Sequence, residues 1–462
     1  MNLQADQSVH EPARDLPVRA MPDVVVVGAG PAGLTAALAA AEEGLKVALV
    51  EGRSYVGGNL TIGLPVLGFL SQKGKPIIAG LPQRFIDRLK AQGAAGEHQA
   101  CPLHVSLTLI DPEAVKLTAL EMLAERGVDL MLYTAFAGVV MEGNRIQAVV
   151  TESKAGREAI VAPVVVDCTG DADVAFRAGV PCEKGDAHGG MQPPTLMFCL
   201  AGVDTEKLRG RLGDDPETYK ADIIPGDYFG RHDRFIVVGL RQQLQQAREA
   251  GLNIATERTI LITGLRPGEV WVNMTRVKGI DGTDPRSLTH GEIETRRQVG
   301  EIVKYLVGYV PGFENARLVA VAPFLGIRET RRIVGQYVMT AEDILSCRRF
   351  DDAVAVASYP IDLHRPDDND CTLEWCGDCY DIPYRSLVPQ AVDNLLVAGR
   401  CISTTHEAMA AIRVMSTCMA TGEAAGRAAA MAVREGVSPG QVDVDLLRRQ
   451  LLERGACLKS PT

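Results

Sequence analysis

Short runs of aliphatic residues without polar alternation dominate the first part of the chain. Residues 23–28 read DVVVVG and residues 46–51 read KVALVE. Such runs are typical of strands buried on both faces of a parallel sheet. Residues 31–43 between them, PAGLTAALAAAEE, are alanine-rich, and alanine has the highest helix propensity. The pattern therefore predicts a strand–helix–strand unit.

The same reading extends over the rest of the N-terminal part. A helix is expected at 111–126, with Asp111 and Pro112 at its N-terminus. Alternating or continuous apolar runs predict strands at 129–134, 138–141, 145–151 and 160–167, and a Gly143-Asn144 turn joins the second and third of these. This is the pattern of an α/β fold with a parallel sheet and a small antiparallel meander.

The middle of the chain has a different pattern. Polar helices at 241–250 and 289–306 mix with strand-like pieces such as 270–274, which predicts an inserted α+β substrate or cap domain at 191–345. The first pattern returns with a buried strand at 394–398 and a long helix at 411–433. One discontinuous domain is thus expected at 23–190 and 346–435, followed by a helical segment at 436–462. Residues 1–22 mix charges and prolines and are expected to be disordered.

A glycine-rich turn joins the first strand to the first helix. Gly28, Gly30 and Gly33 form G-x-G-x-x-G, with Pro31 and Ala32 inside it. In this context Gly28 permits the tight turn, Gly30 lets the backbone approach a pyrophosphate, and Gly33 lets helix and strand pack closely. Glu51 ends the next strand, where a carboxylate can accept hydrogen bonds from a ribose. The motif predicts a bound dinucleotide.

A second glycine turn follows the ribose-binding strand and indicates which dinucleotide it is. Glu51, Gly52 and Arg53 lead into Gly57-Gly58-Asn59, past which an extended FAD would run towards its flavin. A second G-x-G-x-x-G is absent from the sequence, so no standard NAD(P)H domain is expected.

These and further motifs resemble those of a known family. They are Thr61 and Gly63 after the second turn, residues 166–171 (VDCTGD), 325–332 (LGIRETRR), 382–387 (IPYRSL) and 394–400 (NLLVAGR). With them the chain resembles the glutathione-reductase-type FAD-binding superfamily, and more narrowly the bacterial FAD-dependent oxidoreductase family, distantly similar to fumarate reductase and thiazole-biosynthesis flavoproteins. The resemblance implies a Rossmann-like FAD-binding domain, a parallel sheet plus β-meander with an inserted α+β domain. It also implies FAD contacts from Thr169, Gly170, Asp171, Gly399, Arg400, Arg413, Val414 and Met415.

The C-terminal helix is the second expected flavin element. Arg413, Val414 and Met415 lie in its first turns, and small residues such as Gly422 and Gly426 follow. In similar flavoproteins the N-terminus of this helix points at the flavin pyrimidine, where about half a positive charge stabilises the anionic reduced flavin. Ordinary close helix packing is the alternative, and the two interpretations are compatible.

Two residues are candidates for chemistry. His406 stands between the Gly399-Arg400 turn and the C-terminal helix, where an imidazole could take a proton while hydride passes to flavin N5. A structural histidine is the alternative. Arg328, with Arg331 and Arg332 close behind it, suits a carboxylate or an oxyanion, or else a salt bridge to Glu329. Tyr384 and Arg385 are further candidates for the pocket wall.

Three cysteines have a spacing that needs its own interpretation. Cys371, Cys376 and Cys379 form C-x4-C-x2-C, which is similar to part of a plant-type iron–sulfur run, with Cys401 as a conceivable fourth ligand. One alternative is a redox pair of Cys376 and Cys379. The other is three ordinary thiols, in which case the chain has no metal site. A disulfide-reductase mechanism does not fit, because its redox pair would stand near Gly57 and Gly58, where the chain has no cysteine.

Composition and charge narrow the class of protein, its partners and its cell compartment. The net charge of -10 and the lack of a basic run argue against a nucleic-acid partner. No apolar stretch is long enough to predict a membrane span. The 11 scattered cysteines and the absence of a signal-like N-terminus predict the cytoplasm. A chain of 462 residues predicts two joined domains, and a homo-oligomer is compatible with them.

The function expected from the sequence is an FAD-dependent oxidoreductase of dehydrogenase or oxidase type. It would transfer hydride between a small organic substrate and flavin N5, and its electron acceptor is left open. Two alternatives stay open: a redox-neutral flavoenzyme such as an isomerase or lyase, and an electron-transfer component that uses the cysteines at 371, 376 and 379.

Overall fold

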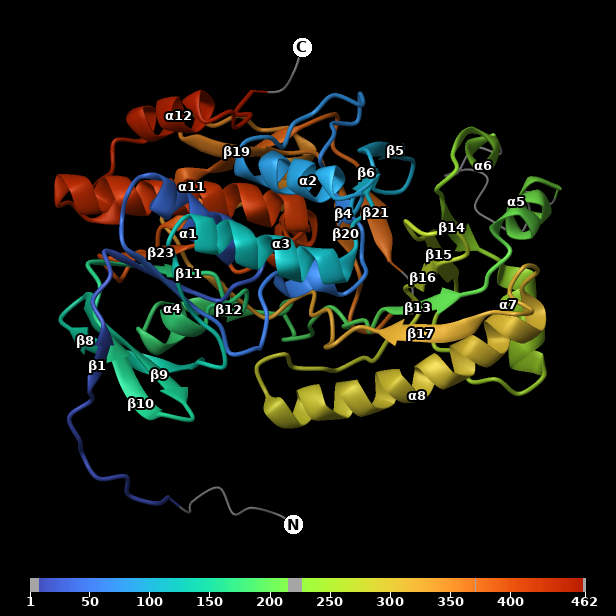
Figure 1. The fold of residues 1–462 in the computed structure, drawn as a ribbon, viewed down its shortest axis with the longest axis horizontal. Coiled ribbons are helices and arrows are strands. Elements are labelled where there is room, and N and C mark those ends of the chain that lie inside the picture. The colour runs from blue at the N-terminus through green and yellow to red at the C-terminus, as the bar shows by residue number, and fades with distance from the viewer. Residues whose placement is uncertain (1–7, 215–226, 370, 460–462) are drawn as a thin grey trace.

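The computed structural model describes residues 8–214, 227–369 and 371–459. A five-stranded parallel sheet forms its centre, in the order β23-β11-β2-β3-β7 (Figure 1). These strands are β2 (Val24–Val27), β3 (Val47–Val50), β7 (Asp129–Met131), β11 (Val164–Asp167) and β23 (Leu395–Val397). β2, β3 and β11 are buried along their whole length, which explains why their sequences lack polar alternation.

Helices cover one face of this sheet and a meander lies on the other side. α1 (Pro31–Glu42) and α11 (Met415–Glu435) pack together against the sheet, near α2 (Leu81–Ala91) and α3 (Pro112–Glu125). The meander consists of β8 (Ala135–Glu142), β9 (Arg145–Ser153) and β10 (Gly156–Ile160), paired antiparallel. Figure 1 shows it below the parallel sheet, next to α4 (Asp173–Arg177).

The N-terminal segment departs from the prediction of a disordered tail. Val18–Ala20 form strand β1, which pairs in parallel with the edge strand β10. The amide of Ala159 donates to Pro17 O at 2.9 Å and that of Val161 to Ala20 O at 3.1 Å. An edge strand presents unpaired backbone groups, and here the tail satisfies them. Residues 1–7 lie outside the described part of the chain.

A second sheet, antiparallel and five-stranded, forms the other half of the molecule. Its order is β14-β15-β16-β13-β17, with β13 (Phe198–Ala201), β14 (Ile236–Gly239), β15 (Thr259–Thr263), β16 (Val270–Val272) and β17 (Arg317–Val321). It packs with α5 (Thr205–Asp214), α6 (Tyr228–Arg231), α7 (Arg241–Glu249) and the long α8 (Pro285–Tyr309) around its own hydrophobic core. The predicted α/β fold with an inserted α+β part is confirmed, and the domain boundaries stay a prediction.

Short elements complete the structure. They are β4 (Val66–Leu67), β5 (Gln99–Cys101), β6 (Val105–Thr108), β12 (Cys182–Lys184), β18 (Arg331–Ile333), β19 (Ala353–Ala357), β20 (Ile361–Leu363), β21 (Thr372–Glu374) and β22 (Tyr380–Pro383), with α9 (Ala341–Leu345) and α12 (Val444–Glu453). Within the described residues, single turns of 3-10 helix at Gly58–Thr61, Tyr384–Leu387 and Pro439–Gln441 add to them. The hairpin β20–β21 and the three-stranded sheet β4-β6-β5 reach the functional site.

The predicted long helix at 411–433 is two helices. α10 (His406–Ile412) ends at Arg413, and α11 begins after Val414, whose backbone is extended with φ -66° and ψ 147°. Residues 412–418, IRVMSTC, include Val, Ser and Thr, which have lower helix propensity than Ala, but they contain no Gly or Pro that would mark a helix end. The break makes Val414 the N-cap and Met415 the first residue of a helix, although both side chains are buried.

Within the described ranges, none of the helices combines the length and the apolar character that crossing a membrane would require.

Candidate active site

One cavity of about 520 Å³ extends from the glycine turn after β2 to the face of the antiparallel sheet. Most residues predicted to bind FAD line it: Gly28, Gly30, Pro31, Ala32, Glu51, Gly52, Arg53, Gly58, Asn59, Thr169, Gly170, Asp171, Gly399, Arg400, Arg413, Val414 and Met415. Gly33 and Gly57 do not line it and act in the packing of the turns. Residues that are far apart in the sequence therefore meet around one space.

The glycine turn has the geometry of a pyrophosphate cradle. Gly28 has φ +93°, and a Cβ on it would come within 2.6 Å of Cys168 O. A Cβ on Gly33 would lie 1.7 Å from Gly28 O, whereas nothing lies within 4 Å of the place where a Cβ of Gly30 would stand. α1 starts directly after Gly30, and no side chain caps its N-terminus. Uncapped N–H groups beside open space fit a phosphate group.

Glu51 is fixed at the end of β3 by two backbone groups. Its Oε2 accepts from Ala29 N and its Oε1 from Arg53 N, both at 2.9 Å. A carboxylate has about four acceptor positions, so both oxygens keep capacity for ribose hydroxyls. The second turn lies across from it, and a Cβ on Gly58 would lie 2.8 Å from Gly30 Cα. This donor and acceptor set fits the adenosine half of FAD.

The turn after β11 is held by buried polar groups. Asp167 accepts from Thr169 N at 3.0 Å, Thr169 Oγ1 at 2.7 Å and Ala175 N at 2.9 Å, and burial raises its pKa. Arg400 pairs with Asp171 at 2.6 Å across the cavity wall. This ion pair joins the segments 166–171 and 394–400, both of which carry motifs of the FAD-binding family.

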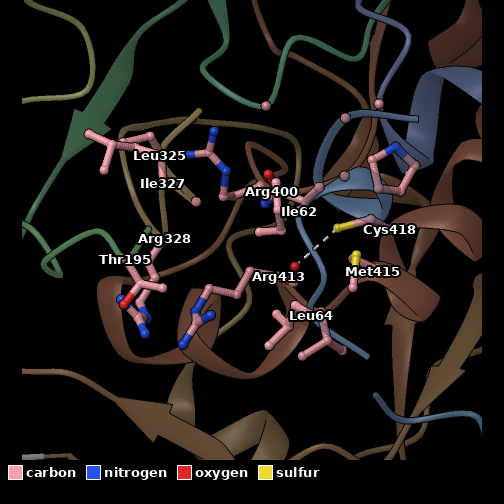
Figure 2. Close-up of a pocket in the computed structure, with 18 of the residues that line it drawn as sticks. Ile62, Leu64, Thr195, Leu325, Ile327, Arg328, Arg400, Arg413, Met415 and Cys418 are labelled. Atoms are coloured by element: carbon pink, nitrogen blue, oxygen red, sulfur yellow. Dashed lines mark hydrogen bonds between the residues drawn. The ribbon is translucent and has the colours of Figure 1, made fainter. Parts of the chain in front are cut away.

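The start of α11 faces the cavity through Val414, Met415 and Cys418, and Figure 2 shows Met415 and Cys418 side by side. No side chain caps this N-terminus, so its N–H groups are available to a ligand. The close approach of α11 to α1 depends on two glycines. A Cβ on Gly422 would lie 2.1 Å from Ala32 O, and one on Gly426 would lie 2.2 Å from Ala36 O. Both predicted roles of this helix, close packing and presentation of its N-terminus, are thus compatible with the geometry.

Arg328 lines the cavity beside Thr195 and Arg413 (Figure 2). Its Nη1 donates to Pro193 O, and the guanidinium makes no ion pair within the described residues, including none with Glu329. Burial and then the nearby charge of Arg413 lower the pKa of Arg328 to about 9. A half-buried cation without a counter-ion is ready to receive an anion.

Asp362 and its neighbours form the polar wall next to Arg328. Asp362 Oδ2 accepts from Tyr359 Oη at 3.1 Å and from Arg413 Nη2 at 3.3 Å. Its Oδ1 lies 3.4 Å from His364 Nε2. Burial would raise the pKa of Asp362, but His364 and Arg413 lower it, so the group stays ionised. Burial and Arg328 lower the pKa of His364 to about 4, so its contact with Asp362 is a hydrogen bond of the neutral ring at pH 7.

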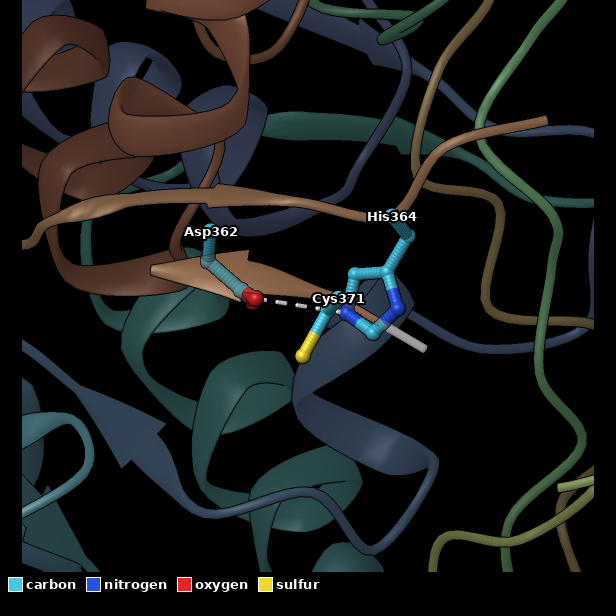
Figure 3. Close-up of side chains that lie close together, drawn as sticks. All are labelled: Asp362, His364 and Cys371. Atoms are coloured by element: carbon cyan, nitrogen blue, oxygen red, sulfur yellow. Dashed lines mark ion pairs between the residues drawn. The ribbon is translucent and has the colours of Figure 1, made fainter. Parts of the chain in front are cut away.

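Asp362, His364 and Cys371 are also the candidate metal ligands of the described chain, because their ligand atoms lie within 4.8 Å of one another (Figure 3). Their hydrogen bonds favour a different role. Arg276 Nη1 lies 3.0 Å from His364 Nδ1, and a guanidinium can only donate, so the ring proton sits on Nε2, the nitrogen turned towards Asp362. A cation would have to displace these bonds and enter among guanidinium groups. The group is better suited to orienting Arg413 and Arg276 around an anion.

His104 is a second imidazole in the cavity wall. Its Nδ1 lies 3.6 Å from Cys101 Sγ, and its ring stacks on Tyr359 with centroids 6.1 Å apart. Nε2 has no protein partner within the described chain. Burial and the charge of Arg413 lower the pKa of His104, and Asp362 opposes them only in part. The ring is therefore neutral at pH 7 and able to take a proton.

His406 does not line the cavity, in contrast to the expectation of a catalytic base there. Its ring is 7% exposed, and Nδ1 lies 2.8 Å from Glu329 Oε1. Glu329 is buried and also pairs with Arg332 at 2.6 Å. The imidazole, the carboxylate and the guanidinium satisfy each other, which favours the structural alternative for His406.

Tyr384 and Arg385 were expected in the pocket wall and are elsewhere. Tyr384 is buried and donates to Pro439 O at 2.8 Å, and Arg385 pairs with Asp352 at 2.9 Å near the surface. The I-P-Y-R-S-L segment is therefore a packing element rather than a wall of the cavity.

The three cysteines at 371, 376 and 379 do not form one ligand group in the described chain. Cys371 lines the cavity with Asp362 and His364. Cys376 and Cys379 are buried next to Cys347, whose Sγ accepts from Gly377 N at 3.1 Å. β21 and the turn after it separate the two places, which a spacing pattern does not show.

Sequence reasoning missed His104, Asp362 and His364. His104 lies in a turn between β5 and β6 without any motif around it. Asp362 and His364 stand two residues apart at the end of β20, and such spacing on a strand places both side chains on one face. The two-residue spacing of Asp362 and His364 was therefore the signal in the sequence that could have identified this polar wall.

The geometry belongs to a flavin enzyme, and comparison with known proteins agrees. Residues 23–451 match the family model described as FAD dependent oxidoreductase, and the chain belongs to this family. The description of the family names FAD as the cofactor.

Among curated proteins, thiamine thiazole synthase of Aeropyrum pernix is 36% identical over 129 residues, 28% of this chain and 43% of the relative. The enzyme of the same name from Pyrobaculum aerophilum is 32% identical over 171 residues, 33% of this chain and 58% of the relative. The chain thus spans about half the length of these relatives. Among solved structures, a geranylgeranyl bacteriochlorophyll reductase-like protein from Thermoplasma acidophilum aligns at 14% identity with a TM-score of 0.48, covering 95% of this chain and 85% of that one. A p-nitrophenol 4-monooxygenase from Pseudomonas putida aligns at 13% identity and 0.49, covering 95% and 87%.

Proposed function

We propose that the enzyme transfers hydride between flavin N5 and a small organic anion held by Arg328. FAD would lie along the glycine turns, with its pyrophosphate at the start of α1, its ribose on Glu51 and its flavin near Met415. When bound, FAD supplies a two-electron acceptor or donor. The remaining chemistry, which is binding and proton movement, falls to side chains of the cavity wall.

The observation that carries this proposal is the state of Arg328. It lines the same cavity as the FAD residues, and no carboxylate in the described chain pairs with it. Its lowered pKa reports that the charge is poorly solvated and lies near a second guanidinium. An organic carboxylate would relieve both effects by accepting two parallel N–H bonds.

The residues around Arg328 would position the anion and handle the proton. Asp362 fixes Arg413 through its side chain and its backbone carbonyl, the latter at 3.1 Å, so the second guanidinium keeps one orientation. His104 takes the role first expected of His406, because it is neutral and reaches the cavity. A proton leaving the substrate would pass to His104 Nε2.

The test is an anaerobic screen of organic carboxylates against the holoenzyme, followed through bleaching of the oxidised flavin. Arg328→Lys and Arg328→Gln should both lower kcat/KM by about 10- to 100-fold, since a point charge does not replace the planar fork. Arg385→Lys is the matched control, because Arg385 pairs with Asp352 away from the cavity and should tolerate the change.

Two results would contradict the proposal. Full activity of Arg328→Gln would remove Arg328 from substrate binding. Conversion of a substrate with no bleaching and no use of an electron acceptor would instead indicate the redox-neutral flavoenzyme.

A further inference from the structure

Strands β14 and β15 border the cavity with apolar side chains, while Arg258 before β15 and Asn273 after β16 also line it. Strands β14 and β15 pair with Ile236 opposite Ile262 and Val238 opposite Ile260. Side chains two residues apart on a strand, and those directly opposite in register, share one face of the sheet. All four side chains line the cavity, so they form one continuous patch in its wall.

Other apolar side chains line the same cavity. They are Leu103 in the turn before β6, Leu107 within β6 and Leu373 of β21. We call the space between these leucines and the β14–β15 patch the apolar slot. The slot is continuous with the part of the cavity that contains Arg328 and Arg413.

The slot lies apart from the residues that fit FAD. The pyrophosphate and ribose residues belong to the turns after β2 and β3, and the flavin residues to the start of α11, whereas the slot is built from β14, β15 and the β6 region. Ile260 keeps part of its surface accessible in the cavity, while Leu261 on the other face of the same strand is 1% exposed in the core. Accessible apolar surface inside a cavity favours a non-polar ligand group.

We propose that the apolar slot binds the hydrocarbon part of the substrate, which makes the substrate an amphipathic organic acid: a carboxylate on Arg328 and a non-polar chain or ring between β14–β15 and Leu107. This inference rests on the proposed function, because it uses Arg328 as the anchor of the carboxylate. It adds the class of substrate and the residues that select it.

The experiment is a binding ladder on the FAD-loaded enzyme. Isothermal titration calorimetry would measure the Kd of straight-chain monocarboxylates from acetate to octanoate. Each methylene that enters the slot should lower Kd by about fourfold, the value for burying one CH₂, until the slot is full.

Substitutions of neighbouring residues separate the slot from the fold. Ile260→Ala should weaken the longer acids by about tenfold and leave acetate unchanged, because only the longer chains reach Ile260. Ile260→Phe should abolish the gain beyond the short acids by filling the slot. Leu261→Ala is the matched control: it shortens the next residue on the same strand, but towards the core, and should keep the wild-type ladder.

The outcomes are distinct. A Kd that falls with chain length and responds to Ile260 but not to Leu261 supports the slot. Acids that all bind with one affinity, or a ladder unchanged in both Ile260 variants, overturn the slot and leave Arg328 as an anion site. Failure of every acid to bind the wild-type enzyme overturns the anion site and the slot with it.

Discussion

Removal of the Glu51 carboxylate tests the adenosine end of the site. The side chain ends β3, and its two oxygens accept from Ala29 N and Arg53 N at 2.9 Å each. Ala29 is fully buried, so Glu51→Ala leaves its N–H without this partner. The substitution also removes the acceptor expected for a ribose hydroxyl. A hydrogen bond to a charged group contributes about 1.5–3 kcal/mol, so the Kd for FAD should rise about 10- to 150-fold.

The assay is titration of apoprotein with FAD, followed by quenching of flavin fluorescence. Glu51→Gln should also bind poorly, because its NH₂ group would face one of two backbone N–H donors. Glu152→Ala is the control, since Glu152 is an exposed carboxylate on β9. Wild-type affinity in Glu51→Ala would show that Glu51 organises the turn without touching the ribose, and the placement of FAD would have to be revised.

Three further predictions follow from other parts of the structure. FAD should be bound without a covalent link and appear in the supernatant after acid precipitation, because burial raises the pKa of the cavity-lining Cys418 to about 12 and keeps it a thiol; colour on the pellet would refute this. His104 must be neutral to accept a proton, and its pKa is lowered, so kcat/KM should stay level as pH falls to about 6.5 and decline only below it. His104→Gln should lose that acid limb together with most of the rate, and an unchanged pH profile would exclude His104 as the base. Arg427 is fully buried with Glu42, Glu43 and Glu423, so Arg427→Met should cost about 3–5 kcal/mol of unfolding free energy in urea, against less than about 1 kcal/mol for the exposed Arg434→Met on the same helix; equal losses would contradict a buried network.

Local sequence was sufficient for the parallel sheet and the FAD turns. The runs around Val25 and Val165 have no polar alternation because both faces of these strands are covered, and the glycines at 28 and 58 stand where a Cβ would collide with neighbouring backbone. Burial of both strand faces and the lack of room for a Cβ each restrict the residue types allowed at a few neighbouring positions. Such restrictions can be recognised from a short stretch of sequence.

The substrate side of the cavity was not predictable in the same way. His406 stands on a suggestive loop, but a contact with Glu329, 77 residues earlier, decides its role. His104 enters the site because the turn between β5 and β6 places its ring against Tyr359, 255 residues later. The break at Arg413 and Val414 likewise falls in a segment without Gly or Pro. Packing between residues far apart in the sequence determines the role of His406, the position of His104 and the helix break. A single sequence gives no local signal for such packing.

The contact between α1 and α11 determines when the FAD-binding half can finish folding during synthesis. Ala32 and Ala36 near the start of the chain are covered by Gly422 and Gly426 near its end, and Thr35 Oγ1 donates to Met419 O at 2.7 Å. A ribosome therefore releases the phosphate turn early but completes its supporting wall only when α11 has been synthesised. Until then the alanine face of α1 stays uncovered, a state in which growing chains are prone to misassociate. A chain that terminates before Met415 should consequently lose FAD binding even though every residue of the dinucleotide turn is present.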